Sequence, residues 1–306
     1  MKTGAIYSNK QAIVATIGFF DGVHRGHRYL IKQVSEIAAS RSMDTAVITF
    51  SQHPRKVMQS EFTPELLTSC EEKQRLLKET GVHHVFLLAF TPELSRFSAR
   101  QFMEVLRQDY NVRVLVIGYD HRFGHNRSEG FHDYVRYGKE LDIEILPAEV
   151  YSEIEVSSSA IRRLLYNGNV SKANILLGYT YRLHGIVVGG YRNGREIGYP
   201  TANLQVTEND KLIPADGVYA VQVTIERENY GGMLSIGRRP TFKNGDNRSI
   251  EVHIFDFQKD IYNEPIEVAF IAHTRNILSF DSINELVTQL SKDKEEVKAL
   301  LKNRIL

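Results

Sequence analysis

The chain has 306 residues, of which 42% are hydrophobic and 25% charged, and its formal net charge is +1. This length is typical of two domains, the composition is that of a soluble globular protein, and the near-zero charge gives no global field that favours nucleic acid or a membrane surface. One cysteine, Cys70, excludes an intrachain disulfide and favours the cytoplasm, and the sequence shows neither a signal peptide nor an apolar run of membrane-spanning length.

The first half of the chain alternates short apolar runs with helical patterns. The apolar runs predict five strands: Ala12–Ile17, Thr45–Phe50, His84–Phe90, Val112–Gly118 and Ile143–Val150. Possible capping boxes begin two of the helices between them, formed by Ser69 with Glu72 and by Ser98 with Gln101. Alternation of this kind predicts a parallel, doubly wound sheet, which binds ligands at the carboxyl ends of its strands.

The turn after the first strand is the most informative segment. Residues Gly18–His27 read Gly-Phe-Phe-Asp-Gly-Val-His-Arg-Gly-His and lead into the amphipathic run Tyr29–Ala39. Unpaired N–H groups at a helix start, glycines that allow close approach, and the imidazoles of His24 and His27 together suit a nucleoside triphosphate. The pattern resembles the His-x-x-His signature of the adenylyl- and cytidylyl-transferring superfamily. The alternatives are a tight turn with two surface histidines and, less favoured, a zinc site, since no third ligand with suitable spacing is nearby.

Three further segments follow predicted strands at the same edge of the sheet. They are Thr49–Pro54, Gly118–Arg127 and Val156–Arg162. The last combines the hydroxyls of Ser158 and Ser159, a helix start and Arg162, which predicts a second anion-binding cradle. Plain N-capping explains one of these serines and remains the alternative.

After about Tyr179 the pattern changes to period-two alternation, as in Tyr219–Ile225 and Ile266–Ile271. Glycine-containing pairs predict the turns between strands: Gly189-Gly190, Asn193-Gly194, Gly231-Gly232 and Asn244-Gly245. Strands with hairpin signals and no helices between them predict an antiparallel barrel or sandwich, which the helical pattern Ser282–Lys302 closes. The change of pattern predicts a domain boundary near residue 180.

The second half has its own dense region, Gly185–Leu204. Its five glycines and two arginines predict a backbone that wraps a polyphosphate. Thr201 and Asn203 stand two residues apart, so on an extended segment they share a face and offer hard oxygen ligands for Mg²⁺. A β-hairpin with a polar face is the alternative. Glu251 lies in an apolar run and is either exposed at an edge or a placed base.

In this order, the motifs resemble those of the bacterial bifunctional riboflavin kinase/FAD synthetase family over nearly all of residues 12–300. The first family motif is matched by Gly18, Phe20, Asp21, Gly22, His24, Gly26 and His27, and a later one by Ser158, Ser159, Ile161 and Arg162. The resemblance implies a Rossmann-like nucleotidylyltransferase domain over residues 1–178. It implies a riboflavin kinase-like barrel with a C-terminal helix over residues 179–306.

By this resemblance, the first half would convert FMN and ATP to FAD and pyrophosphate. The residues expected at the ATP phosphates are His24, His27, Arg162, Ser158, Ser159, Gly18, Phe20, Asp21, Gly22 and Gly26. Asp21 either orients a histidine or binds adenosine. The residues expected at the flavin are Asp120, Phe123, Asn126, Arg127 and, in the second half, Arg275.

The resemblance likewise implies that the second half converts riboflavin and ATP to FMN. Glu251 would accept the proton of the ribityl 5′-hydroxyl as it attacks the γ-phosphorus, while Thr201 and Asn203 hold Mg²⁺. The residues expected at the ATP phosphates of this half are Gly189, Gly194, Arg195 and Thr201. Three positions depart from the family pattern, Gln52, His121 and Ile277, and the last two put flavin contacts in doubt.

Other functions stay open at this point. One is a nucleotidylyltransferase for another phosphate monoester, joined to a degenerate kinase domain. Another is a non-catalytic flavin sensor or interaction protein, which the presence of His24, His27, Asn203 and Glu251 disfavours. An RNA-binding barrel is weakly indicated by arginines of the second half and disfavoured by the net charge. We expect small-molecule substrates and no nucleic acid or membrane partner, and the sequence does not determine the oligomeric state.

Overall fold

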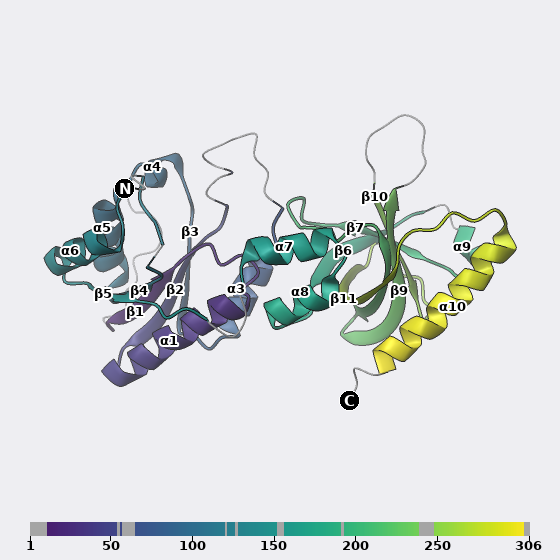
Figure 1. Ribbon diagram of the computed structural model, residues 1–306, viewed down its shortest axis with the longest axis horizontal. Coiled ribbons are helices and arrows are strands. Elements are labelled where there is room, and N and C mark those ends of the chain that lie inside the picture. The colour runs from purple at the N-terminus through teal and green to yellow at the C-terminus, as the bar shows by residue number, and fades with distance from the viewer. Residues whose placement is uncertain are drawn as a thin grey trace. The chain divides into compact units, whose positions relative to one another are not determined.

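A computed structural model describes residues 11–53, 56, 65–119, 121–125, 128–151, 156–190, 193–238 and 248–302. The chain divides into two compact units, residues 1–158 and 159–306. The first holds a parallel sheet with helices, and the second holds an antiparallel barrel (Figure 1).

The sheet of the first unit has five parallel strands in the order β3-β2-β1-β4-β5. The strands are β1 Ile13–Ile17, β2 Asp44–Phe50, β3 His84–Leu88, β4 Val112–Ile117 and β5 Glu144–Pro147. All five predicted strands are confirmed, although β5 ends at Pro147, three residues earlier than predicted. The strand order reverses between β1 and β4, so the loop after β1 leaves the sheet at the switch point where such folds bind ligands.

Helices cover both faces of this sheet (Figure 1). They are α1 Arg25–Arg41, α3 Cys70–Lys78, α4 Pro92–Ser95, α5 Ala99–Tyr110 and α6 Phe131–Leu141. On one face α1 packs Val34 and Ala38 against Val14 of β1. On the other face α5 and α6 bury Met103 and Tyr134 against alternate residues of the same strands. The sheet is therefore doubly wound, as predicted.

Both predicted capping boxes are present. The Ser69 hydroxyl accepts from the Glu72 N–H at 3.1 Å, and the Glu72 carboxylate accepts from the Ser69 N–H at 2.8 Å. Ser98 and Gln101 make the equivalent pair at the start of α5. Each box satisfies N–H groups that a helix start leaves without intrahelical partners.

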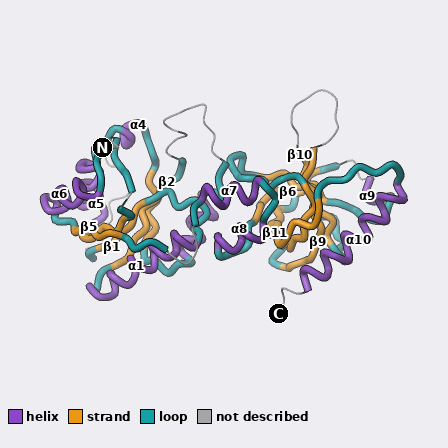
Figure 2. Tube along the Cα trace, viewed as in Figure 1, coloured by secondary structure: helices purple, strands orange, loops and turns teal. Residues whose placement is uncertain are grey.

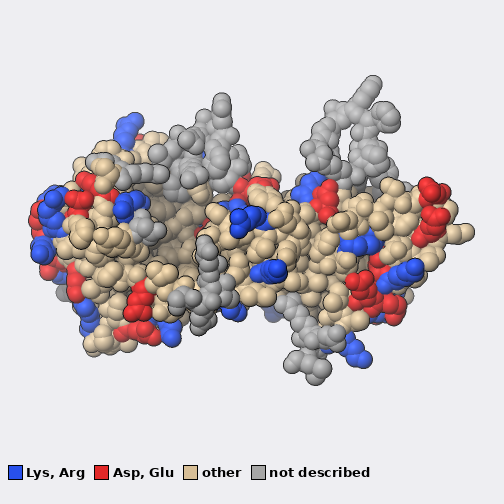
Figure 3. All heavy atoms as spheres, in the orientation of Figure 1, with Lys and Arg blue, Asp and Glu red and all other residues tan. Residues whose placement is uncertain are grey.

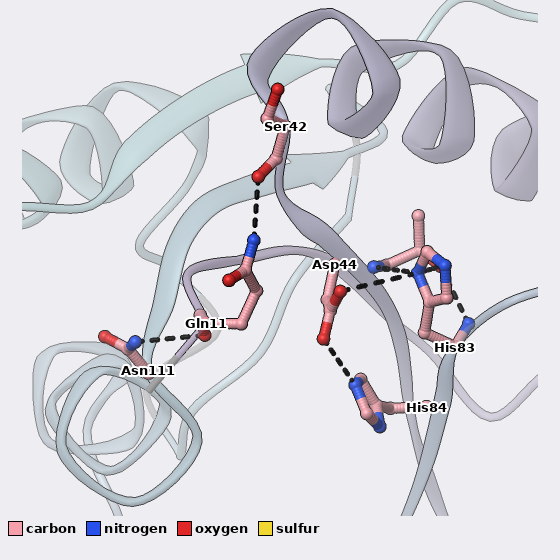
Figure 4. A network of polar contacts seen from close by, with 7 residues as sticks. Gln11, Ser42, Asp44, His83, His84 and Asn111 are labelled. Carbon is pink, nitrogen blue, oxygen red and sulfur yellow. Dashed lines mark hydrogen bonds and ion pairs between the residues drawn. The ribbon is translucent and has the colours of Figure 1, made fainter. Parts of the chain in front are cut away.

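A network of polar contacts joins the amino ends of the strands (Figure 4). The Asp44 carboxylate contacts His84 Nε2 at 3.0 Å, which links the first residues of β2 and β3. Asn111 Nδ2 donates to the Gln11 carbonyl at 3.0 Å, and Gln11 Nε2 donates to the Ser42 carbonyl at 2.8 Å. Contacts among its own residues thus stabilise the amino edge of the sheet. The β1 loop with its histidines lies at the opposite, carboxyl edge.

The second unit is built on a closed antiparallel barrel in the order β10-β7-β6-β11-β8-β9. Figure 2 shows the strands of this unit in orange. Its strands are β6 Arg182–Val188, β7 Ala202–Val206, β8 Gly217–Ile225, β9 Glu228–Arg238, β10 Arg248–Ile254 and β11 Pro265–Arg275. Its helices are α8 Val170–Leu177, α9 Asn193–Glu196 and α10 Ile283–Lys302, and α7, Ser158–Tyr166, begins at the division between the units. The predicted barrel and closing helix are confirmed.

One predicted turn is wrong. Gly231 and Gly232 lie inside β9, and the hairpin between β8 and β9 turns at Glu226 and Arg227, whose φ values are 49° and 74°. The glycines serve close packing instead of a turn. A Cβ at Gly231 would lie 2.7 Å from Leu301 of α10, and one at Gly232 would lie 2.9 Å from a backbone oxygen of the neighbouring strand.

Two other predicted turns have different outcomes. Asn193-Gly194 opens the short helix α9, and Asn244-Gly245 lies outside the described residues.

The surface of the described residues carries both signs of charge. Lys and Arg side chains are interspersed with Asp and Glu over both units on the face shown in Figure 3. No helix in the described ranges combines the length and the hydropathy that a bilayer-crossing segment needs.

Candidate functional site

The loop from Gly18 to His24 has an unusual backbone. Phe20 and Val23 adopt left-handed conformations with φ of 55° and 36°, and Gly22 has a φ of 79°. Left-handed backbone is costly for residues with a Cβ and is found where the surrounding structure holds it in place. Gly18 also has little room, because a Cβ there would lie 3.1 Å from the Phe20 ring. The loop is therefore a constrained structure that its neighbours must stabilise.

Asp21 is the main anchor of this loop. Its carboxylate is buried and accepts from the N–H groups of Leu67 and Thr68 at 3.0 and 3.2 Å, and from the Thr68 hydroxyl at 3.2 Å. The Gly22 N–H in turn donates to that hydroxyl oxygen at 3.1 Å. From another segment, the Ser158 hydroxyl donates to the Asp21 carbonyl at 3.0 Å. Asp21 thus holds three segments together, a role that the sequence did not indicate.

The two histidines of the motif lie together at the start of α1. His24 is the N-cap residue, and its Nδ1 accepts from the His27 N–H at 3.3 Å, which places a neutral imidazole's proton on Nε2. The two rings stack with centroids 3.6 Å apart. Gly26 lies beside them, since a Cβ there would be 3.4 Å from the His24 ring. The predicted juxtaposition of both imidazoles with a helix N-terminus is therefore present.

The surroundings of His27 keep it neutral. Burial, followed by the charges of His24 and Lys73, lowers the pKa of His27 well below 6.5. Its Nδ1 is buried and has no hydrogen-bond partner within the described residues. A buried ring nitrogen without a partner is costly unless a ligand or water satisfies it. A neutral imidazole here offers a hydrogen bond to a phosphate and not a full positive charge.

The other predicted phosphate residues lie at or near the start of α7. Ser158, its first residue, uses its hydroxyl to fix the β1 loop. Ser159 is exposed, and Arg162 is partly buried one turn further along the same helix.

Of the predicted flavin residues of the first unit, only Phe123 is among the described residues; Asp120, Asn126 and Arg127 lie outside them. The Phe123 ring stacks on Tyr134 with centroids 4.2 Å apart and packs against the core of the sheet. The ring of His121, one of the family departures, lies 6.0 Å from that of Phe123.

In the second unit the barrel brings the predicted base and metal ligands together. Glu251 of β10 lies opposite Asn203 of β7, and the Thr201 hydroxyl donates to Glu251 Oε2 at 3.3 Å. Asn203 is buried, and a Cβ at Gly190 would lie only 2.1 Å from its Nδ2. The Gly190 backbone therefore closes over the Asn203 amide, and three oxygen-bearing side chains share one patch of the barrel.

A cavity of about 480 Å³ adjoins this patch. Its lining includes Thr201, Arg195, Lys259 and Tyr262, together with apolar residues of β7 and β10. Two of these, Thr201 and Arg195, were predicted from the sequence, whereas the segment around Lys259 was not.

The glycine-rich loop contributes Arg195 to the lining of this cavity. Gly194 accepts at its carbonyl from the Tyr199 N–H at 2.8 Å, and a Cβ there would lie 2.2 Å from the Tyr199 carbonyl oxygen. Only glycine fits that close approach. A Cβ at Gly189 would meet open space, so sterics do not require glycine at this position.

His253 is a residue of this site that sequence reasoning missed. Its Nδ1 donates to the Pro200 carbonyl at 2.8 Å, immediately before Thr201. Burial is the main cause that lowers the pKa of His253, so a neutral ring makes this bond. The signal was its position two residues after Glu251, because such residues share a face of a strand.

Arg275, the predicted flavin residue of the second unit, is engaged within the barrel unit. Its guanidinium donates to the Asp293 carboxylate, with Nη2 at 2.7 Å and Nε at 3.0 Å. Asp293 lies on α10 and is only 1% exposed. The pair therefore attaches α10 to the end of β11, while nearby Ile277 is exposed.

Comparison with known proteins gives two family matches that cover most of the chain. A family described as FAD synthetase matches residues 6–160, and one described as riboflavin kinase matches residues 177–301. Among curated relatives, the bifunctional riboflavin kinase/FMN adenylyltransferase of Listeria monocytogenes is 37% identical over 94% of this chain and 91% of its own length. Those of Bacillus subtilis and Escherichia coli K12 are each 34% identical, over 92% and 93% of this chain and 90% and 91% of theirs.

A solved structure agrees with the whole fold. It is described as a macrolide-efflux protein from Streptococcus pneumoniae, is 34% identical, covers 95% of both chains and has a TM-score of 0.86.

Proposed function

Since this chain belongs to the bifunctional riboflavin kinase/FMN adenylyltransferase family, we propose that its two reactions use two separate sets of residues, one set near each of the sites described above. The chain phosphorylates riboflavin to FMN and adenylylates FMN to FAD with release of pyrophosphate. The family matches do not favour the alternative of another phosphate monoester with a degenerate kinase.

For adenylyl transfer, we assign the triphosphate of ATP to the start of α1. A phosphate oxygen of FMN attacks the α-phosphorus, the bond from that phosphorus to the bridging oxygen breaks, and pyrophosphate leaves. The phosphate monoester is already nucleophilic, so the protein's task is to align the reactants and stabilise charge. The observation that supports this most is the stacked pair of His24 and His27, with the unpartnered Nδ1 of His27 at a helix N-terminus. Arg162 and Ser159 remain proposed contacts to the phosphates, and Ser158 acts by holding the loop.

For riboflavin phosphorylation, we assign the base to Glu251. Its carboxylate accepts the proton of the ribityl hydroxyl, whose oxygen attacks the γ-phosphorus of ATP as the bond to the β-phosphate oxygen breaks. The contact between Thr201 and Glu251 at 3.3 Å supports this, because it places the carboxylate beside a residue that lines the cavity. Arg195 and Lys259, which also line the cavity, are suited to the phosphates by their charge.

The same patch fits a magnesium ion bound to the ATP phosphates. The hydroxyl of Thr201 and the amide oxygen of Asn203 are the hard oxygen donors that Mg²⁺ takes, and Glu251 lies next to them. The described residues contain no group of three His, Cys, Asp or Glu side chains that could hold a metal ion by themselves. We therefore propose that Mg²⁺ enters with the nucleotide, where it would neutralise phosphate charge.

The flavin contacts and the boundaries remain proposals as well. Phe123 and Arg275 are assigned to flavin sites, with Arg275 fixed by Asp293. We place the functional boundary between residues 178 and 179, close to residue 177, where the riboflavin kinase match begins. The two compact units divide earlier, after Ser158. Cys70, the single cysteine, supports the cytoplasm as the location of the protein.

Two substitutions in the full chain test the assignments. E251Q should lower FMN formation by about 10²–10⁴-fold, the range for loss of a general base, while FAD formation from supplied FMN persists. H27Q should lower FAD formation by about 10²-fold, as for loss of one donor to transition-state charge, while FMN formation persists. Both rates are measured by chromatography of the flavins with magnesium-ATP.

Matched controls are E208Q, at an exposed loop position, and H83Q, at the opposite edge of the sheet. Loss of both activities in either test variant would contradict the assignment of two separate sites.

A further inference from the structure

A buried lysine lies beside the β1 loop and has no part in the mechanism described so far. Lys73 of α3 is only 2% exposed. Its Nζ donates to the Phe50 carbonyl at 2.7 Å and lies 3.9 Å from the centroid of the Phe19 ring. Burial of an ammonium is costly unless such contacts compensate it, and a cation over an aromatic face is one of them.

These contacts join the loop to the neighbouring strand. Phe19 belongs to the constrained loop that leads to His24, and Phe50 is the last residue of β2. The Thr49 hydroxyl donates to the Phe19 carbonyl at 3.0 Å, so the backbone and the ring of Phe19 are both held. The His53 ring packs on the same phenyl group with centroids 4.6 Å apart. Lys73 is therefore part of the support that a strained loop requires.

We propose that Lys73 is a positioning residue for adenylyl transfer: its charged ammonium fastens the β1 loop to the end of β2, so that His24 and His27 keep their geometry at the start of α1. This inference rests on the function proposed for the two histidines. It assigns no contact between Lys73 and the substrates.

The electrostatic surroundings make the charge of Lys73 sensitive to pH near neutrality. Burial lowers the pKa of Lys73 to about 8. Cys70 on the same helix and Asp21 on the β1 loop act in the opposite direction and raise this pKa. The charge of Lys73 also acts on His27 of α1 and helps to lower the pKa of His27. The ring of His53 also packs against the Phe19 ring. The ammonium is thus charged at pH 7 and loses its proton as the pH rises through about 8, which removes the attraction to the Phe19 ring.

The test compares K73M and K73R with the exposed control K78M on the same helix, all in the full chain. K73M should lower kcat for FAD formation from FMN by about 10²-fold, the effect of a misplacement near 1 Å, while riboflavin phosphorylation and K78M stay at the wild-type rate. In the wild type, FAD formation should fall above about pH 8. K73R, which stays charged, should lack this fall and retain more activity than K73M.

Wild-type FAD formation by K73M, or the same alkaline fall in K73R as in the wild type, would overturn the proposal. If K73M does not fold, the comparison of the two pH profiles still decides it. Failure of the underlying assignment is recognised separately, because H24A and H27Q would then leave FAD formation intact whatever Lys73 does.

Discussion

The neutral state of His27 links the candidate site to the stability of its unit. Burial, followed by the charges of His24 and Lys73, lowers the pKa of His27 well below its ordinary value of 6.5. Above about pH 6.5 the His27 ring is neutral in both the folded and the unfolded chain, so it adds no pH dependence to the free energy of unfolding. Below this pH, the unfolded chain takes up a proton that the folded chain excludes, and the free energy of unfolding falls.

We therefore expect the free energy of unfolding of the first unit to fall by up to about 1.4 kcal/mol for each pH unit below about 6.5. H27Q, which does not titrate, should remove this part of the slope. Denaturant unfolding of both proteins between about pH 7.5 and about pH 5.5 measures it. Parallel curves for the two proteins would contradict the assignment of a depressed pKa to His27.

At the scale of single residues, the sequence predicted the histidine motif but not the buried lysine, Lys73. The histidine motif was predictable because a short glycine-rich string between a strand and a helix has few other uses. Lys73 was not predicted, although it lies three and four residues before Leu76 and Leu77 and so shares the buried face of α3. A charged residue on an apolar helical face is the signal that was available. The partners that allow its burial, Phe19 and Phe50, come from distant segments and could not be derived from spacing.

At the scale of elements, periodicity predicted the five strands of the sheet and the barrel strands around Tyr219 and Val268, because each buries one or both faces in a regular pattern. Glycine-containing residue pairs predicted the turns less reliably than periodicity predicted the strands. Gly231 and Gly232 looked like a turn, yet glycine is needed there so that α10 and the neighbouring strand can approach β9. Such a requirement depends on tertiary packing, which the sequence does not show.

The attachment of α10 is open to a direct test. Asp293 is 1% exposed and is paired with Arg275, whose side chain is 18% exposed. Replacing one partner leaves a largely buried charge without compensation, which typically costs about 3–5 kcal/mol. We expect D293N to lower the free energy of unfolding of the second unit by about 3 kcal/mol, measured by denaturant unfolding. E295Q, at an exposed position of the same helix, serves as the control.

A double substitution shows whether charge or packing dominates at this contact. R275M combined with D293L removes both charges and should recover most of the lost stability, since apolar pairs of similar volume often replace buried ion pairs without loss. If D293N unfolds at the wild-type denaturant concentration, the ion pair does not hold α10 to the barrel.

At the scale of the whole molecule, two unrelated folds in one chain carry the two consecutive reactions. The FAD synthetase match ends at residue 160 and the riboflavin kinase match begins at residue 177, so each reaction has its own fold. Two residues assigned to adenylyl transfer, His24 and His27, stack at the carboxyl edge of the sheet. Two residues assigned to phosphorylation, Glu251 and Asn203, lie opposite each other on the barrel. FMN is the product of the reaction assigned to the barrel and the substrate of the reaction assigned to the unit with the parallel sheet.

Separate sites predict that two defective chains complement each other. H27Q should still make FMN, and E251Q should still use it, so neither variant alone converts riboflavin to FAD at an appreciable rate. An equal mixture of the two, supplied with riboflavin and magnesium-ATP, should form FAD after a lag in which FMN accumulates in solution. The lag should shorten as the total protein concentration rises, because FMN must reach a second molecule. A chain that carries both substitutions is the control and should form neither product. If the mixture makes FMN but no FAD, while E251Q alone still adenylylates supplied FMN, the FMN made by H27Q would have to stay bound to that chain instead of entering solution.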